Sequence, residues 1–390
     1  MALDLNLISI IVFYVLIALF FWYRRKNLSV QYKILLLYRS KFWAKTIGKI
    51  AKKTPRFWQW FGYASVPAGF IGMSVILGFL TWKFIELFTI PEAIPAVSPV
   101  LPGIKIPGAP IFLPFWYGII ALAFVIIVHE FAHGFVAESW GLKLKSAGVG
   151  LLALLPLAFV EPDEKKLAKL PMKKQLSIFG AGPFSNIIWA FIIFLVITFA
   201  AAPAIANVLE PAGLFVEDVT PDLPAEAAGL QHGDIILGVD SVQVNTTQNF
   251  VKYMNTIKPG QTVSIETQRG PIQVTTTQNP ENASKSHLGV QFKQNIDVKS
   301  QIKEKYGRSP MVLFYFTQLL YWILTLNIGI GLINLLPLGI MDGGRMLKIV
   351  LDNKIKRKKT IKAIWTFFVV FSLFMLLANL IGPYLIKAFI

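Results

Sequence analysis

Six long apolar runs constrain this chain more than any other feature of its sequence. They lie at residues 6–23, 62–86, 112–138, 176–201, 311–337 and 363–386. A helix that crosses a bilayer needs about 20 mostly apolar residues, and its backbone groups must be paired within the segment. Hydrophobic residues make up 55% of the chain, more than an ordinary soluble domain contains. The sequence therefore predicts a polytopic α-helical membrane protein with about six transmembrane helices.

Positive charge is distributed unevenly between these runs. Of the 38 Lys and Arg residues, 11 lie in segment 24–60, 7 in segment 139–175 and 8 in segment 345–362, whereas loop 87–111 contains only Lys105. Because short cytoplasmic loops are enriched in Lys and Arg, the three basic segments are expected to lie on the cytoplasmic side of a cell membrane. The net charge of +17 then belongs to membrane flanks that attract anionic lipid, and nucleic acid is not an expected partner.

The amino-terminal domain, residues 1–60, is expected to combine the first span with a basic segment. Its apolar run ends in 24-RRK-26 without a small-residue cleavage site, which indicates an uncleaved span. Segment 24–60 mixes basic residues with apolar runs such as 34-ILLLY-38. This mixture favours an interfacial amphipathic helix, and a solvated loop is the alternative.

Residues 203–305 differ in character from the rest of the chain. They are rich in Thr, Gln, Asn and Val, and runs such as 262-TVSIETQ-268 alternate apolar and polar positions. The pairs 259-PG-260 and 269-RG-270 are turn signals. A β-rich domain on the extracytoplasmic side is expected here, between membrane domains at 61–201 and 311–390, with the active site towards the cytoplasmic side.

The stretch 121-ALAFVIIVHEFAHGFVAESW-140 places three ionisable residues in an apolar span. His129 and His133 are four residues apart and project from one face of a helix, with Glu130 beside them. Two such imidazoles can share a zinc ion, and the glutamate can act as a base toward water. The chain has no Cys, so further ligands must be His, Asp or Glu. The alternative is a set of polar residues that line a bundle or an ion path.

Catalytic zinc usually takes three protein ligands, so a third is needed. Glu138 and Glu161 are carboxylates downstream of the histidines. A more suggestive candidate is Asp342 in 334-NLLPLGIMDGGRML-347, where Pro and Gly can interrupt a helix near a metal or substrate. From this stretch alone, a zinc ligand and a helix-end cap are equally good readings of Asp342.

Three motifs, in order, resemble the site-2 protease family of intramembrane zinc metalloproteases, peptidase family M50. They are HEFAHG at 129–134, 180-GAGPFSN-186 and 334-NLLPLGIMDGG-344, and the resemblance covers roughly residues 112–350. It implies a three-helix catalytic core, one zinc ion per chain, and Asp342 as the third ligand. Many relatives read NxxPxPxLDG in the last motif. Here Gly339, Ile340 and Met341 precede the aspartate, a departure that concerns substrate contacts rather than the metal.

The segment 221-PDLPAEAAGLQHGDIILGVDSVQV-244 resembles a PDZ domain of the permuted type found in proteases. The resemblance implies that a peptide adds as a strand along 213-GLFVEDV-219, which makes Gly213, Leu214, Phe215 and Val216 a candidate peptide-binding loop for a peptide C-terminus. The alternative is a domain that only restricts access to the active site.

The predicted function is hydrolysis of peptide bonds within or near transmembrane segments of single-span membrane proteins, in regulated intramembrane proteolysis. Glu130 is the expected catalytic base. Asn186 and Asn334 are expected to hold the unwound substrate backbone or to contact the zinc ligands, with interhelical hydrogen bonding as the alternative. A transporter or proton path built on the same His and Glu residues is a second hypothesis. It predicts internal repeats among the spans, and none is visible.

Overall fold

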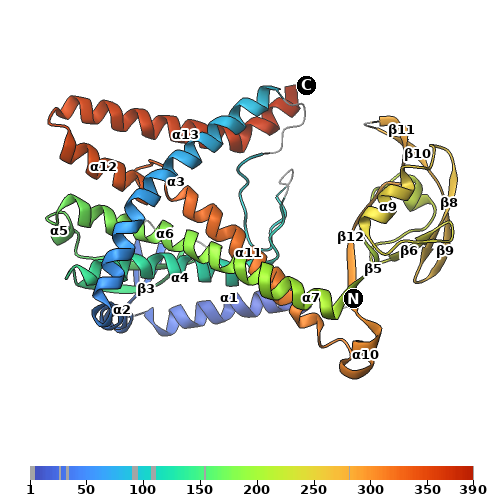
Figure 1. Cartoon of the computed structure of the whole chain (residues 1–390), viewed down its shortest axis with the longest axis horizontal. Coiled ribbons are helices and arrows are strands. Elements are labelled where there is room, and N and C mark those ends of the chain that lie inside the picture. Colours follow the sequence, from blue (N-terminus) through green and yellow to red (C-terminus); the bar gives the residue numbers. More distant parts are fainter. Residues whose placement is uncertain are drawn as a thin grey trace. The chain divides into compact units, whose positions relative to one another are not determined.

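The computed structural model describes residues 5–25, 28–31, 35–89, 95–106, 111–152, 155–280 and 282–389. Contacts divide the chain into two compact units, and Figure 1 traces their elements in chain order. The first unit comprises Met1–Ile197 and Gln318–Ile390, and the second comprises Thr198–Thr317. The second unit is longer at both ends than the β-rich range 203–305. Each unit is described by itself.

Six helices in the described part of the chain are long and apolar enough to cross a membrane. They are α1 (Leu5–Tyr23), α3 (Pro55–Thr89), α4 (Phe115–Ser139), α6 (Met172–Val196), α11 (Met311–Ile333) and α13 (Lys358–Phe389). A π-helical turn at Ile197–Ala201 continues α6 into α7 (Ala202–Val208). The predicted class of a six-helix membrane protein with a β-rich insertion is confirmed. The fifth helix ends earlier than expected, at Ile333, because residues 334–341 form tight turns that lead into α12 (Asp342–Lys354).

The first unit also contains a four-stranded antiparallel sheet in the order β1-β2-β3-β4. Its strands are β1 (Leu28–Gln31), β2 (Leu35–Ser40), β3 (Leu144–Leu152) and β4 (Leu155–Pro162). The amphipathic helix expected over 24–60 is therefore only partly right. Residues 41–53 do form an amphipathic helix, α2, whereas β1 and β2 are extended because β2 pairs with β3 along its whole length.

Helices α3, α4 and α6 pack around one another and form the core of the first unit. Buried Phe61, Val136 and Ile178 come from these three helices and belong to one apolar cluster. The short helix α5 (Glu164–Leu167) connects β4 to α6. Helix α12 also packs against α6, and Met346 of α12 lies in an apolar cluster with Met73 of α3.

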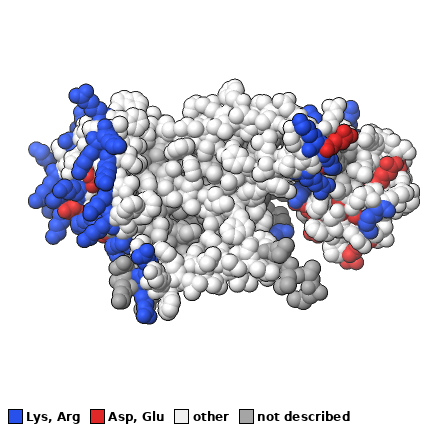
Figure 2. All heavy atoms as spheres, turned by 90° about the horizontal axis from the view of Figure 1, so that it is seen from below, with Lys and Arg blue, Asp and Glu red and all other residues white. Residues whose placement is uncertain are grey.

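Lys and Arg residues gather at one end of the first unit. Figure 2 shows this basic end as a dense blue region, and Figure 1 places α2, α5 and the α12–α13 turn there. Phe42 and Trp43 of α2 are exposed among these lysines, while Ile47 is buried. Aromatic and basic residues together are typical of a membrane–water interface.

The second unit is built on an antiparallel sheet in the order β12-β5-β6-β8-β9, with β7 paired to β6. Its strands are β5 (Leu209–Val219), β6 (Ile235–Val239), β7 (Val242–Gln243), β8 (Thr262–Thr267), β9 (Gly270–Thr275) and β12 (Val290–Val298), with a separate pair β10 (Thr277–Asn279) and β11 (Asn282–His287). Helices α8 (Pro224–Ala227), α9 (Thr247–Met254) and α10 (Ser300–Tyr306) complete it. Leu214, Ile236 and Ile265 are fully buried in its core. The turns expected at 259–260 and 269–270 are present.

The candidate peptide-binding loop is not at a free strand edge. Within β5, Leu214 and Phe215 pair with β6 on one side and with Gln294 and Lys293 of β12 on the other. Strand addition is therefore blocked at Leu214 and Phe215, whereas Asp218 and Val219 pair with β12 alone, so peptide binding along 213–219 stays a prediction. The sheet order places β12 beside β5 at the end of the sheet, so β12 is the outer strand on that side.

Candidate active site

The three predicted zinc ligands lie together in the first unit. His129 and His133 are one turn apart on α4, and their Nε2 atoms are 3.2 Å from each other. Asp342 begins α12, and its Oδ2 atom lies 3.1 Å from Nε2 of His129 and 3.3 Å from Nε2 of His133. Among the described residues, these three form the one group of His, Asp and Glu side chains arranged to hold a metal ion.

The donor set fits a zinc ion. Ligand atoms about 2.0–2.1 Å from a tetrahedral zinc are separated by about 3.3 Å from one another. The observed separations of 3.1, 3.2 and 3.3 Å are close to that value. Two imidazoles and one carboxylate leave a fourth position for water or substrate, as catalytic zinc sites require.

Gly182 provides the space next to these atoms. A Cβ atom at Gly182 would lie 2.3 Å from Nε2 of His133 and 2.7 Å from Nε2 of His129. The backbone of α6 therefore approaches the cluster more closely than any residue with a side chain allows. A Cβ atom at Gly180 would meet Ser65 of α3 at 2.7 Å. The two glycines of 180-GAGPFSN-186 thus allow α6 to pack closely against α4 at Gly182 and against α3 at Gly180.

Each histidine has a second contact that orients its ring. Nδ1 of His133 lies 2.6 Å from the carbonyl oxygen of Ile178. A carbonyl oxygen can only accept a hydrogen bond, so Nδ1 carries the proton and Nε2 is the free ligand atom. Nδ1 of His129 lies 3.2 Å from Nδ2 of Asn186, whose side chain is fully buried and whose Oδ1 has no hydrogen-bond partner among the described residues. Asn186 therefore contacts one of the predicted zinc ligands directly.

Glu130 is held by the sheet. The backbone N–H of Val160 donates a 3.0 Å hydrogen bond to Oε2 of Glu130. Val160 belongs to β4, the outer strand of the sheet, so this edge faces the active centre. Glu130 is also within electrostatic reach of His133, His129 and Asp342. One carboxylate oxygen is thereby fixed, and Oε1 makes no hydrogen bond within the described ranges.

The turn before α12 presents Asp342. The N–H of Gly343 donates to the carbonyl oxygen of Asn334 at 2.8 Å. Cβ atoms at Gly343 and Gly344 would lie 2.0 Å from the carbonyl oxygen of Leu335 and 1.9 Å from that of Leu338, so only glycine fits at either position.

The other candidate residues lie elsewhere or contribute differently. Asn334 supports the Asp342 turn through its backbone, and its side chain makes no hydrogen bond to another described residue. Glu138 accepts a hydrogen bond from the N–H of Leu144. Glu161 accepts one from Ser146, which together with Arg39 lowers the pKa of Glu161. Neither glutamate joins the metal-binding group.

Three backbone contributions were missed from the sequence. They are the carbonyl oxygen of Ile178, the N–H of Val160 and the missing side chain of Gly182. Backbone groups leave almost no residue-type signal, because any residue at 178 supplies the carbonyl oxygen and any residue except proline at 160 supplies the N–H. Gly182 did have a signal in the GAGP motif, which indicates helix packing or a kink as readily as space for a metal.

Comparison with known proteins places the chain in a family. The family model described as "Peptidase family M50" matches residues 117–376, two thirds of the chain. An uncharacterized protein of Methanocaldococcus jannaschii is 32% identical over 329 residues, which cover 81% of this chain and 78% of that protein. Zinc metalloprotease RasP of Shouchella clausii is 24% identical over 235 residues, 50% of this chain and 54% of the relative.

Solved structures with similarity to part of the chain include PDZ domains. The PDZ domain of the SdrC-like protein of Listeria monocytogenes is 27% identical and covers 21% of this chain and 87% of that chain, with a TM-score of 0.19. The family match includes α4, α6, α11 and α12, the elements that contribute or support the clustered residues. The chain belongs to peptidase family M50, and it is an intramembrane zinc metalloprotease.

Proposed function

We propose that one zinc ion per chain is held by His129, His133 and Asp342, and that Glu130 is the base and acid of peptide-bond hydrolysis. The observation that supports this most directly is the set of three donor atoms 3.1–3.3 Å apart, with Glu130 adjacent to His129 on the same helix. An ion or proton path has no comparable support, because it needs a chain of such groups across the bilayer.

The residues divide the chemistry between them. When bound, zinc polarises the scissile carbonyl and lowers the pKa of water toward about 7. Glu130 accepts a proton from the attacking water at Oε1, while Val160 holds Oε2 in place. Glu130 then delivers that proton to the leaving amine nitrogen, so the same carboxylate serves as base and acid. Asn186 and Ile178 keep the two imidazole rings oriented.

The substrate class follows from the depth of the site. His129 lies ten residues before Ser139, the last residue of α4, which is about 15 Å along the helix axis. That depth is about half of a hydrocarbon core roughly 30 Å thick. A substrate must therefore enter the membrane region, and a single-span membrane protein does so. Its helix must unwind, because helical peptide bonds are shielded by their own hydrogen bonds.

An extended substrate segment fits the outer edge of β4. Val160, Ala158 and Pro156 alternate along this strand, each opposite a residue of β3. The N–H of Val160 points away from the sheet toward Glu130, and Pro156 has no N–H to offer at the corresponding position. We infer that the unwound substrate pairs along this edge and thereby passes the Glu130 carboxylate. Asn334, the first residue of 334-NLLPLGIMDGG-344, is proposed to help hold the unwound substrate backbone.

The orientation in the membrane follows the charge pattern. The basic end of the first unit is proposed to face the cytoplasm and anionic lipid headgroups, with the second unit on the outer side. The active site is then reached from the cytoplasmic side.

A peptide C-terminus is proposed to bind the second unit at the free edge of β12 instead of β5. Phe292 on this strand packs against Phe250 of α9, with ring centroids 4.9 Å apart. Hydrogen–deuterium exchange with an apolar C-terminal peptide tests this placement. Slower exchange in 290–294 is expected, and slowing confined to other strands would contradict it.

The catalytic proposal is tested with Glu130→Gln in the full chain. Cleavage of a single-span substrate is expected to fall at least 100-fold with zinc content unchanged, because base catalysis is lost and no ligand is removed. Glu138→Gln is the matched control, since it changes a buried glutamate on the same helix but keeps the oxygen that accepts from Leu144. Cleavage by Glu130→Gln at the control rate would refute the role of Glu130.

A further inference from the structure

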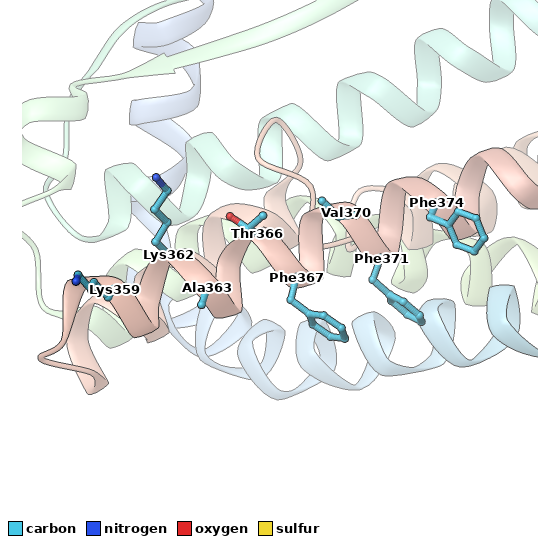
Figure 3. Close-up of a pocket in the computed structure, with 8 residues that line it drawn as sticks. All are labelled: Lys359, Lys362, Ala363, Thr366, Phe367, Val370, Phe371 and Phe374. Atoms are coloured by element: carbon cyan, nitrogen blue, oxygen red, sulfur yellow. The ribbon is translucent and has the colours of Figure 1, made fainter.

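A groove along α13 lies outside the active site and has no role in the proposed chemistry. Its volume is about 760 Å³. Eight residues of α13 line it, as Figure 3 shows: Lys359, Lys362, Ala363, Thr366, Phe367, Val370, Phe371 and Phe374. They recur at intervals of three and four residues, so the groove follows one face of the helix.

The groove is charged at one end and apolar along the rest. Lys359 and Lys362 lie at the basic end of the first unit, and neither pairs with a carboxylate in the described parts of the chain. Phe367, Val370 and Phe374 are 61%, 59% and 52% exposed. The rings of Phe367 and Phe371 stack with their centroids 5.8 Å apart, so this face carries a pair of parallel phenyl rings.

We propose that this groove binds an anionic glycerophospholipid, with the phosphate at Lys359 and Lys362 and an acyl chain along the phenylalanines. The apolar part, from Ala363 to Phe374, rises eleven steps along the helix, about 16 Å. One leaflet of a hydrocarbon core roughly 30 Å thick has that length. The groove therefore matches one lipid of one leaflet in length as well as in charge. Such a site is more specific than the general attraction of anionic lipid to the basic end.

Two other occupants fit the groove less well. A second copy of the chain packed through the same face in the same membrane orientation would bring both pairs of lysines together, which is electrostatically unfavourable. A substrate helix packs closely where small residues line the contact, and Ala363 is the one small apolar residue of this face. Flexible acyl chains adapt to protruding phenyl rings more readily than a second helix does.

The opposite face of α13 connects the groove to the catalytic loop. Met375 is buried in a cluster with Leu336 and Leu338, which belong to the turns before Asp342. Nδ2 of Asn379 donates to the carbonyl oxygen of Leu80 at 2.9 Å and fixes α13 to α3. A lipid on the outer face would therefore hold α13 against the segment that presents a metal ligand, and the first unit should become more stable when it binds.

Native mass spectrometry of the full chain in detergent tests the proposal with phosphatidylglycerol and phosphatidylcholine. The wild type is expected to retain phosphatidylglycerol preferentially and to gain thermal stability with it. Lys359→Gln/Lys362→Gln is expected to weaken this binding on the order of tenfold or more, because two headgroup contacts are lost. Lys354→Gln/Lys356→Gln removes two charges from the same segment outside the groove and should bind like the wild type.

Each contrary outcome would overturn the proposal. Equal binding by the Lys359/Lys362 double variant and the wild type would exclude this site. Equal retention of phosphatidylcholine would exclude headgroup recognition, and displacement of the lipid by inorganic phosphate would indicate a free anion as the ligand. Dimers that disappear in the same double variant would identify a second copy as the occupant. None of these measurements depends on zinc or on proteolysis.

Discussion

The Cα atom of Gly182 faces Nε2 of His133 so closely that a methyl group between them would lie 2.3 Å from that nitrogen. The same methyl group would lie 2.7 Å from Nε2 of His129. A helix glycine thus limits what fits beside the metal ligands. Its role is spatial, because α6 keeps its helical course through this position.

Replacing Gly182 with alanine should therefore reduce zinc binding. Gly182→Ala is expected to lower the zinc content per chain and, with it, proteolysis, because the methyl group displaces the imidazoles. Gly78→Ala on α3 is the control, since a Cβ there meets no atom within 4 Å. Alanine stabilises a helix by up to about 1 kcal/mol relative to glycine, so the control should not lose stability. Full zinc occupancy in Gly182→Ala, measured by atomic emission, would contradict this assignment.

The hydrogen bond from Val160 to Glu130 predicts a kinetic effect without loss of metal. Val160→Pro removes the N–H that holds Oε2 and should lower kcat about 10- to 100-fold with zinc retained. Ala158→Pro removes an N–H two residues earlier on the same edge, remote from Glu130. If the substrate pairs along β4, that control raises KM more than it lowers kcat. Equal kcat values for Val160→Pro and Ala158→Pro would argue against the positioning of Glu130 by Val160.

Asn186 should affect zinc affinity through His129. With zinc on Nε2, Nδ1 of His129 carries a proton and needs an acceptor, which the Asn186 amide supplies when its oxygen faces the ring. Asn186→Leu is expected to weaken zinc binding about 10- to 100-fold in chelator competition, whereas Asn186→Asp should retain it.

Asn327→Leu is the matched control for Asn186→Leu. Asn327 is also fully buried, but its Nδ2 donates to the carbonyl oxygen of Ile323 in its own helix. Similar zinc affinities of the two leucine variants would show that the contact with His129 is unimportant.

The second unit should lose stability in acid through Asp234. Burial acts to raise the pKa of Asp234, but hydrogen bonds from Arg269 and from the N–H of Gln231 outweigh burial and lower it. A lowered pKa in the folded state stabilises the fold above the ordinary aspartate pKa of about 3.9, and this stabilisation is lost as pH falls below that value. The protection factors of β6 and β8 amides against hydrogen exchange should fall below about pH 4 in the wild type.

Asp234→Asn tests the source of that pH dependence. The variant should show faster exchange than the wild type at neutral pH and a smaller change on acidification. Asp218→Asn removes an exposed carboxylate from the same sheet and should behave like the wild type. An unchanged acid response in Asp234→Asn would place the titrating group elsewhere.

Local patterns in the sequence predicted the membrane helices and the histidine pair well. Spans are set by composition over about 20 residues, and His129, Glu130 and His133 acquire their relative positions from one helix turn. Asp342 lies 213 residues beyond His129, so no periodicity connects them, and the residues alone left a helix cap as an equal alternative. The resemblance to a family favoured the ligand over the cap, and the clustering of Asp342 with the two histidines supports the same choice.

Long-range strand pairing caused the errors. Leu35 pairs with Leu152, and Val216 pairs with Phe292, in both cases across more than 70 residues of chain. Apolar residues near lysines in 35–40 are as compatible with an interfacial helix as with a strand. Likewise, the sequence of 213–219 identifies a strand but not its neighbours, which decide whether an edge is open.

The position of Asp342 also determines how the enzyme can be divided. Everything from Gly134 to Met341, including the whole second unit, lies between the histidines and the third ligand in the chain. A break anywhere in 198–317 therefore leaves an amino-terminal fragment with the base and two ligands and a carboxy-terminal fragment with the third. If the proposed ligands and base are correct, neither fragment is expected to be active alone, although α12 keeps its packing surface on α6. If the chain were cut there, recovery of protease activity on mixing the two fragments would report that they had reassembled.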